Sequence, residues 1–294
     1  MDMLSLRLFL RIADLGGISA AAYDLSLSPA SASARLVKLE ETVGVRLFNR
    51  TTRAVSLTTD GEAFLPYAQQ VIEALETGLS AIKGPGAAVR GRLRMTLPGS
   101  FGRMYVIPTL GAFQARYPLI HLDLRLSDEV LDVVAGAYDL IIRNASLADS
   151  RLTIRKLAPD RRLLVAAPAY LARQGFPATP ADIATHQCIT LIGDRQWTFE
   201  NGQTIEVSAA STVNDGEAMR AMIEQGMGIG VKSLWNASES LKSGRLVEVL
   251  PNFPLKAEAA LWLLYPSRRI IAPKVQAMID FLLEQFQPVP PWER

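Results

Sequence analysis

The stretch SPASASARLVKLEETVG at positions 28–44 constrains the fold most, because it predicts a helix with an unusual first half. Apolar residues at helical spacing occur in it only from Leu36 onward. Ser28 is expected to cap the helix, and Pro29 suits the first helical position because its missing N–H has no partner to lose there. Gly44 is expected to end it. The small residues before Leu36 favour a helix whose front approaches another surface closely.

Two helical segments precede this stretch and define its setting. LSLRLFLRIADL at 4–15 carries apolar residues at helical spacing, and Gly16 and Gly17 follow as C-cap residues can. Ser19 is then expected to cap a short helix, AAAYDL, which a turn at 26–27 separates from the longer helix. This order of helix, short helix, tight turn and longer helix predicts a helix-turn-helix, whose second helix enters the DNA major groove by its N-terminal end.

Residues 28–58 are the predicted contact region for double-stranded DNA. Small side chains at the helix front would let the backbone approach bases and phosphates, and segment 28–57 holds five basic and two acidic residues, net +3. VRLFNRTTRAVSLT at 45–58 predicts a β-hairpin wing against the sugar-phosphate backbone, or alternatively a hairpin that only faces solvent. The candidate DNA-binding residues are Ser28, Pro29, Ala30, Ser31, Ser33, Ala34, Arg35, Lys38, Arg50, Thr51, Thr52 and Arg53.

A long helix is expected to follow, with Thr59 and Glu62 in the spacing of a capping box. Pro66 should kink this helix or delay its regular part. The pattern predicts dimerisation through a coiled coil, with packing on the helix's own domain as the alternative. The composition of KGPGAAVRG at 83–91 predicts a hinge. The residues of the predicted seam are Leu65, Ala68, Ile72, Leu75, Leu79 and Ile82.

The remaining two-thirds of the chain alternates strands and helices, which is typical of an α/β fold with a parallel sheet. We therefore expect two α/β lobes with a double crossover and a cleft between them. The first set has strands at 93–97, 121–126 and 139–143 and helices at 105–117 and 128–137. The second set has RLLVAAP at 162–168, a strand at 188–192, a helix at 214–226 and GIGVK at 228–232. LWLLYP at 261–266 then returns the chain, and a helix at 273–286 closes it.

Two groups of motifs resemble one known family, the LysR-type transcriptional regulators. Residues 25–40, LEETVGVRLFNRT at 39–51 and LTTDG at 57–61 resemble its winged helix-turn-helix. FQARYPLIHLDLRL at 113–126, the strand DLIIR and the turn GMGIG resemble its effector domain, which is itself similar to periplasmic solute-binding proteins. The family often has Arg directly after the serine that Ser33 matches, whereas this chain has Ala there, so the family's base contacts are not transferred.

The patterns and the resemblance together predict the domain organisation and the partners. The implied partners are promoter DNA with an interrupted palindrome, a small-molecule effector, further copies of this chain through the linker helix and effector domains, with tetramers common in the family, and RNA polymerase as a further candidate. The predicted parts are a DNA-binding domain at 1–58, a linker helix at 59–84, a hinge at 85–91 and an effector domain at 92–294, with lobe I at 92–161 and 268–294 and lobe II at 162–267.

A small anionic effector is expected where PGSFG at 98–102 meets the second lobe. Ser100 would cap the helix after strand 93–97, so that the N–H groups of Phe101 and Gly102 point into the cleft at the carboxyl ends of the strands. The alternative for Ser100 is capping without a ligand. The further candidates are Asn214, as the start of a helix in the opposite lobe, and Arg143, which could instead form a structural ion pair.

Other function classes fit the sequence less well. PGSFG nearly matches the G-x-S-x-G elbow of hydrolases, but Pro98 replaces the first glycine and the chain has only two histidines, so no catalytic residue is assigned. GMGIG lacks dinucleotide-binding spacing, and His186 with Cys188 offers too few ligands for a metal, so we expect no cofactor. A solute-binding protein or enzyme with an accessory helical domain would leave 1–82 unexplained. One cysteine and no long apolar run predict a cytoplasmic protein without membrane contact.

Overall fold

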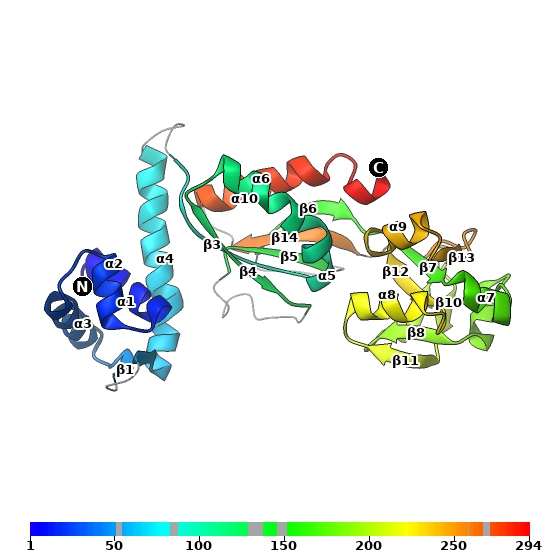
Figure 1. Cartoon of the computed structure of the whole chain (residues 1–294), viewed down its shortest axis with the longest axis horizontal. Coiled ribbons are helices and arrows are strands. Elements are labelled where there is room, and N and C mark those ends of the chain that lie inside the picture. Colours follow the sequence, from blue (N-terminus) through cyan, green and yellow to red (C-terminus); the bar gives the residue numbers. More distant parts are fainter. Residues whose placement is uncertain (51–54, 83–87, 129–137, 146–151, 258, 267–270) are drawn as a thin grey trace. The chain divides into compact units, whose positions relative to one another are not determined.

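A computed structural model describes the chain except for residues 51–54, 83–87, 129–137, 146–151, 258 and 267–270 (Figure 1). The described residues form two compact units, an N-terminal one within Met1–Ala87 and a C-terminal one that contains most of the chain from Ala88 onward. Residues 129–137 of the predicted helix and residues 85–87 of the predicted hinge lie outside the described residues. Among those described, no helix is both long and apolar enough to cross a membrane.

The N-terminal unit is a winged helix-turn-helix followed by a long helix, as predicted. Gly16 at φ 65° and Gly44 at φ 83° end the first and third helices in the left-handed conformation that glycine adopts without steric cost. The two strands pair antiparallel and form the wing. The elements are α1 (Met3–Leu15), α2 (Ile18–Asp24), α3 (Pro29–Val43), β1 (Phe48–Arg50), β2 (Val55–Leu57) and α4 (Thr59–Ile82).

Two predicted helix caps are wrong by one or two residues. Gly17 caps α2, since the Ala21 N–H donates to its carbonyl oxygen at 3.1 Å, so Ser19 lies inside the first turn. Thr58 caps α4 in place of the Thr59–Glu62 box, because the Gly61 N–H donates to the Thr58 hydroxyl at 2.9 Å. Both helices therefore begin slightly earlier than the side-chain pattern indicates.

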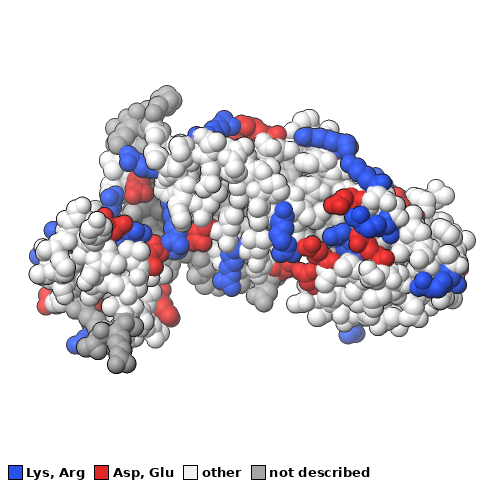
Figure 2. Space-filling view, in the orientation of Figure 1, with Lys and Arg blue, Asp and Glu red and all other residues white. Residues whose placement is uncertain are grey.

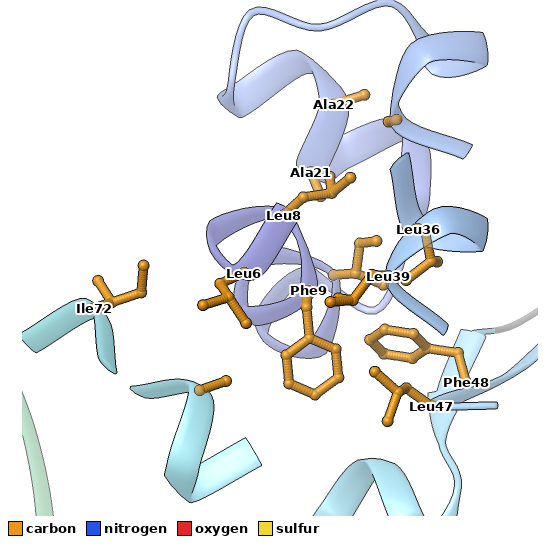
Figure 3. Packing of buried hydrophobic residues seen from close by; sticks show 13 residues of the cluster. Leu6, Leu8, Phe9, Ala21, Ala22, Leu36, Leu39, Leu47, Phe48 and Ile72 are labelled. Carbon is orange, nitrogen blue, oxygen red and sulfur yellow. The ribbon is translucent and has the colours of Figure 1, made fainter. Parts of the chain in front are cut away.

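The core of the N-terminal unit joins all its helices and the wing (Figure 3). The Phe9 ring lies with its centroid 5.3 Å from that of Phe48, on the wing, and 5.3 Å from that of Phe64, on α4. From α4 itself, Ala68 and Ile72 are buried in the same cluster. The wing and the start of α4 are thus held firmly against the helix-turn-helix.

The helix α4 uses the predicted coiled-coil seam in two different ways. Ala68 and Ile72 pack inside the unit's own core, and Leu65 lies partly buried against it, as the alternative interpretation requires. Leu75 and Leu79, one and two turns further, are 37% and 46% exposed. Only the second part of the seam is therefore available to a partner. The helix begins well before Pro66, so the expectation that this proline delays its regular part is wrong.

A five-stranded sheet forms the first half of the C-terminal unit, which we call lobe I. Its strand order is β4-β3-β5-β14-β6, in which β3 runs parallel to β4 and β5, and β14 runs antiparallel to β5 and β6. The helices α6 and α10 lie side by side (Figure 1), with the Phe113 and Phe281 rings 5.2 Å apart. The strands are β3 (Gly91–Leu97), β4 (Ile120–Leu126), β5 (Leu140–Ala145), β6 (Leu152–Pro159) and β14 (Ala260–Pro266).

The helices of lobe I include one unbroken helical run of mixed type. It begins earlier than the predicted start at Tyr105 and changes type before Pro108, which has no N–H to donate to the preceding turn. The closing helix has its predicted bounds. The elements are α5 (Gly99–Phe101), η1 (Gly102–Val106), η2 (Ile107–Thr109), α6 (Leu110–Arg116) and α10 (Pro273–Phe286).

The second half, which we call lobe II, contains three small sheets. The order in the largest is β12-β7-β13, while β8 pairs with β11 in parallel and β9 pairs with β10 antiparallel. The strands are β7 (Arg162–Ala166), β8 (Cys188–Leu191), β9 (Gln196–Thr198), β10 (Thr204–Glu206), β11 (Ala209–Val213), β12 (Gly230–Ser233) and β13 (Val247–Val249). The helices are α7 (Pro168–Gln174), η3 (Pro180–Thr185), α8 (Gly216–Glu224) and α9 (Leu234–Lys242), with η4 (Pro291–Glu293) at the end of the chain.

Candidate DNA interface and effector site

The front of α3 is exposed and carries only short side chains. The Ser31 N–H donates to the Ser28 hydroxyl at 3.1 Å, so the predicted cap is confirmed, with Pro29 in the first turn. Ala32 has the opposite role, because it is fully buried where α3 meets the core. Of the predicted contact residues on α3, Ser28, Pro29, Ala30, Ser31, Ala34 and Lys38 are exposed, whereas Ser33 and Arg35 are half-buried.

The two basic residues of α3 lie in different surroundings. Arg35 donates to both carboxylate oxygens of Asp2, at 3.1 and 3.3 Å. Asp2 in turn caps α1 by accepting the Ser5 N–H at 2.8 Å, and this hydrogen bond is the main reason that the pKa of Asp2 is lowered. Lys38 is exposed one turn further along. A phosphate would therefore meet Lys38 directly but would compete with Asp2 for Arg35.

The wing is fixed to α3 by one carboxylate. Glu40 accepts the backbone N–H groups of Leu47 and Phe48 at 2.9 and 3.2 Å, and thereby sets the direction of the chain entering β1. Arg50 is the last residue of β1. The remaining predicted contacts of the wing, Thr51, Thr52 and Arg53, lie outside the described residues.

Helical structure follows β3 directly at the predicted effector segment, but the expected roles of its residues are wrong in part. Pro98 precedes the first helical residue, so Ser100 lies within the first turn and does not cap it. The Gly102 N–H donates to the Pro98 carbonyl oxygen at 2.8 Å and is not free for a ligand. Phe101 is fully buried, with its ring edge-on to Trp235 at 5.4 Å, so its side chain packs lobe I against lobe II.

Ser100 nevertheless occupies a distinctive position. Ser100 is 96% buried as a residue, and its hydroxyl has no hydrogen-bond partner among the described residues. The hydroxyl oxygen faces lobe II, since a Cβ added at Gly216 would lie 3.9 Å from it and 3.6 Å from the Lys232 Nζ. We call the surroundings of Ser100 and Gly216 the lobe junction. A buried hydroxyl without a partner is costly in a folded protein, which makes this position a candidate ligand contact.

The helix α8 faces the junction with a carboxylate at its N-terminus. Asn214, the predicted start of this helix, is exposed and lies two residues before it. Asp215 is the actual cap, and its side chain accepts the Ala218 N–H at 2.7 Å. The prediction placed the helix start too early because Asn and Asp are equally good caps and stand next to each other in the sequence. An anionic ligand would thus meet a negative charge at this end of α8.

Arg143 lies in the second half of β5, which continues two residues beyond the predicted strand end. Its guanidinium donates to the Ile142 carbonyl oxygen at 2.9 Å and to the Thr96 hydroxyl at 3.4 Å. Burial lowers the pKa of Arg143, and the charge of Asp128 acts in the opposite direction. Burial likewise raises the pKa of Asp128, to which the Gly99 N–H is hydrogen-bonded, and the nearby Asp215 raises it further. Asp128, in lobe I, is therefore close enough to interact with the charge of Arg143 in the same lobe and with that of Asp215 in lobe II.

Besides Asp128 and Asp215, three more junction residues were not predicted as site residues. Arg103 forms an ion pair with Glu217 at 2.8 Å and so links η1 to α8. Lys232 is buried on β12, where its ammonium donates to the Gly216 carbonyl oxygen, and burial lowers its pKa to about 8. The sequence did contain a signal for Lys232, because a lysine interrupts the apolar run GIGVK. The pairing of Arg103 with Glu217, 114 positions apart, has no local signal.

The residues considered for catalysis or metal binding have other partners. His186 Nδ1 lies 3.1 Å from the Tyr170 hydroxyl, which also accepts the Gln187 N–H at 2.9 Å. Cys188 is buried, and burial raises the pKa of its thiol to about 11. Within the described residues, no group of three or more His, Cys, Asp or Glu side chains could hold a metal ion.

Comparisons with known proteins agree with this architecture. Residues 3–62 match the bacterial regulatory helix-turn-helix protein of the lysR family, and residues 86–287 match the LysR substrate binding domain. The chain is a LysR-type transcriptional regulator. It is 33% identical over 289 residues to the HTH-type transcriptional regulator DmlR of Escherichia coli K12, covering 96% of this chain and 93% of the relative.

Two further similarities cover nearly all of this chain and of the related protein. A probable HTH-type transcriptional regulator of Klebsiella pneumoniae, LtrA, is 32% identical over 287 residues, covering 95% of this chain and 93% of LtrA. The solved structure of CrgA, a LysR-type regulator from Neisseria meningitidis, aligns with a TM-score of 0.62 and 26% identity, covering 97% of this chain and 98% of CrgA. The regulator thus has a DNA-binding helix-turn-helix and an effector-binding domain, and it is not an enzyme.

Proposed function

We propose that the front of α3 enters the major groove of promoter DNA and that the wing follows the adjacent backbone. Arg35, Lys38, Arg50 and Arg53 would hold phosphates, while Ser31 and Ser33 reach base edges. Exposure of the short side chains at the front of α3 is the observation that carries the proposal. Ser28, Pro29, Ala30 and Ala34 permit the close approach, and Thr51 and Thr52 complete the predicted contacts of the wing.

The linker helix α4 joins two copies of the regulator in this proposal. Tyr67, Val71, Leu75 and Leu79 are exposed apolar residues spaced four apart, so they form one stripe along α4. A second copy that covers this stripe would place two recognition helices on the two halves of an interrupted palindrome. Contacts between effector domains then join two such dimers into a tetramer. We retain the predicted domain boundaries at 58, 84 and 91 for this arrangement.

The regulator responds to a small molecule at the lobe junction, where Ser100 and Arg143 offer donors to a negatively charged group. The main support is the buried hydroxyl of Ser100, which has no partner among the described residues. Binding there would change the fit of the protein to DNA and to RNA polymerase in the cytoplasm. The Gly102 amide is excluded from this site because it donates to the Pro98 carbonyl oxygen, and the cap of α8 that faces the site is Asp215, not Asn214.

Gel-shift and footprinting assays test the proposal together. We expect the purified protein to protect two half-sites upstream of its own reading frame, and we expect substitutions at Ser31 or Ser33 to change sequence preference rather than overall affinity. A single protected site, or an unchanged preference in both serine variants, would contradict the assignment.

A further inference from the structure

The chain segment that connects the two lobes contains a buried carboxyl group. The strand β6 of lobe I ends at Pro159 and β7 of lobe II begins at Arg162, so residues 160–161 form this segment, which we call the lobe connection. Figure 2 shows acidic and basic side chains beside each other at the surface over α8 and α9, where water solvates them. Asp160 differs from these because it is only 2% exposed. Its charge therefore depends on the few groups that surround it.

One oxygen of Asp160 is bonded to both lobes. Asp160 Oδ2 accepts hydrogen bonds from the side-chain amide of Asn144 and from the hydroxyl of Ser233, each at 3.0 Å. Asn144 lies on β5 of lobe I, whereas Ser233 is the last residue of β12 of lobe II. Directly after it, the Leu234 N–H donates to the carbonyl oxygen of Arg161 at 2.7 Å. The lobes are thus joined by a small polar cluster around Asp160.

Two oxygens of this cluster lack a donor. Asp160 Oδ1 and Asn144 Oδ1 are buried atoms without a hydrogen-bond partner among the described residues. While the carboxyl group is ionised both oxygens are acceptors only, and a buried acceptor without a donor is costly. A carboxylic acid, in contrast, pairs with an amide through two hydrogen bonds, because the acid O–H donates to the amide oxygen and the amide N–H donates to the acid. The second of these bonds is already present.

The charged groups around Asp160 do not supply the missing donor. Arg162 Nε lies 3.6 Å from Oδ2, too far for a hydrogen bond, and its side chain is 41% exposed. Arg161 forms its own ion pair with Glu248 at 3.7 Å. On β12, Lys232 interacts with Asp160 electrostatically, but its ammonium is hydrogen-bonded within lobe II. Burial outweighs the hydrogen bonds and the charge of Arg162, and it raises the pKa of Asp160.

We infer that Asp160 is a proton switch in the lobe connection. The protonated side chain pairs with Asn144 through both of its oxygens while it holds Ser233, whereas the ionised side chain keeps only the contacts of Oδ2. Uptake of a proton therefore tightens the link between the lobes, and release of the proton loosens it. Since closure of two lobes around a ligand is a common switching transition, the regulator responds to acidification as well as to its effector.

Two measurements on the full chain test the switch. Carbon-13 NMR follows the carboxyl resonance of Asp160, and we expect its titration midpoint to lie above the ordinary 3.8. Hydrogen exchange follows the Leu234 amide, corrected for the intrinsic pH dependence of exchange. We expect this amide to exchange about fivefold more slowly below the midpoint than above it. A midpoint at or below 3.8, or equal exchange on both sides of the midpoint, would overturn the inference.

Two matched variants separate Asp160 from other titrating groups. Asp160→Asn has one donor and one acceptor, as the protonated acid has, so its Leu234 amide should exchange slowly at every pH. Asp194→Asn is the control, because burial also raises the pKa of Asp194, which follows β8 within lobe II. This control should keep the pH dependence of the wild type. The inference fails if the dependence persists in Asp160→Asn or disappears in Asp194→Asn. The titration of the wild-type carboxyl needs no variant, so it decides even if Asp160→Asn does not fold.

Discussion

Lys38 and Arg35 differ in how freely they can meet a phosphate. Because Lys38 is exposed, Lys38→Ala should weaken binding to every DNA sequence and reduce the slope of log affinity against log salt by about one unit. Arg35→Ala should have the smaller effect, since Asp2 already holds its guanidinium. Fluorescence anisotropy over a salt series measures both slopes. Lys242→Ala, in α9, is the control, and a Lys38→Ala slope equal to that of the wild type would exclude the predicted contact.

Removing the Ser100 hydroxyl is expected not to lower the free energy of unfolding. Since its buried hydroxyl lacks a partner among the described residues, Ser100→Ala should leave the ligand-free protein as stable as the wild type, or more stable by about 1 kcal/mol. Ser240 is the matched control, because it is equally buried but bonded to Arg220 and Glu224, so Ser240→Ala should destabilise. Urea unfolding measures both. A clear loss of stability in Ser100→Ala would mean that the hydroxyl is satisfied in the fold.

Lys232 should make stability depend on alkaline pH. Burial lowers its pKa from the ordinary 10.5 to about 8, so between these values the unfolded chain binds more protons and the free energy of unfolding rises with pH. The total rise reaches about 3 kcal/mol. Lys232→Met should remove it, so the variant should gain most over the wild type below pH 8 and least near pH 10.5. A pH-independent difference in urea unfolding would contradict this.

Side chains that cap helices show how far sequence reasoning reaches. Ser28 and Gly44 are correct because Pro29 fixes the first helical position directly after Ser28 and Gly44 adopts the left-handed conformation that ends α3. Ser19 and Asn214 are wrong because another residue that can cap lies within two positions, and tertiary packing decides between the two. Lys232 and its junction partners could not be found locally, since they meet only after both lobes have folded.

The exposed apolar stripe of α4 is expected to hold the dimer together. Leu75→Glu with Leu79→Glu should break the dimer without unfolding the N-terminal unit, because both side chains are exposed in it. Ile72→Glu should instead unfold this unit, since it buries a charge in the core at a cost of several kcal/mol. Sedimentation velocity with circular dichroism distinguishes the two results. A double variant that stays dimeric would rule out the exposed stripe as the interface.

Strands and helices were predictable where their apolar pattern is regular. The strands β3 and β4 follow a period-two pattern, β5 begins with a short continuous apolar run, and α10 follows a helical pattern; all four are found close to where they are expected. The edge strand β6 was not predicted, because LTIRKLAP breaks the alternation with adjacent Arg and Lys. The short strands β9 and β10 have three residues each, too few for a pattern to stand out.

The order of the domains and the protein family were easier to predict from the sequence than the chemistry of the effector. The helix-turn-helix layout, the linker and the α/β lobes each have long motifs, and the matches at 3–62 and 86–287 agree with them. The chemistry of the effector depends instead on charges brought together from distant positions. Sequence alone therefore indicated an anion, whereas the lobe junction also contains the carboxylates of Asp128 and Asp215.

Specific DNA binding is the central claim, and one affinity ratio tests it most directly. The full chain is titrated, by fluorescence anisotropy at about 0.15 M salt, against the DNA upstream of its own reading frame and against shuffled DNA of the same composition. We expect binding to the upstream DNA to be tighter by about 10³ or more. Equal affinity for the two DNAs, or no binding to either, would contradict the account.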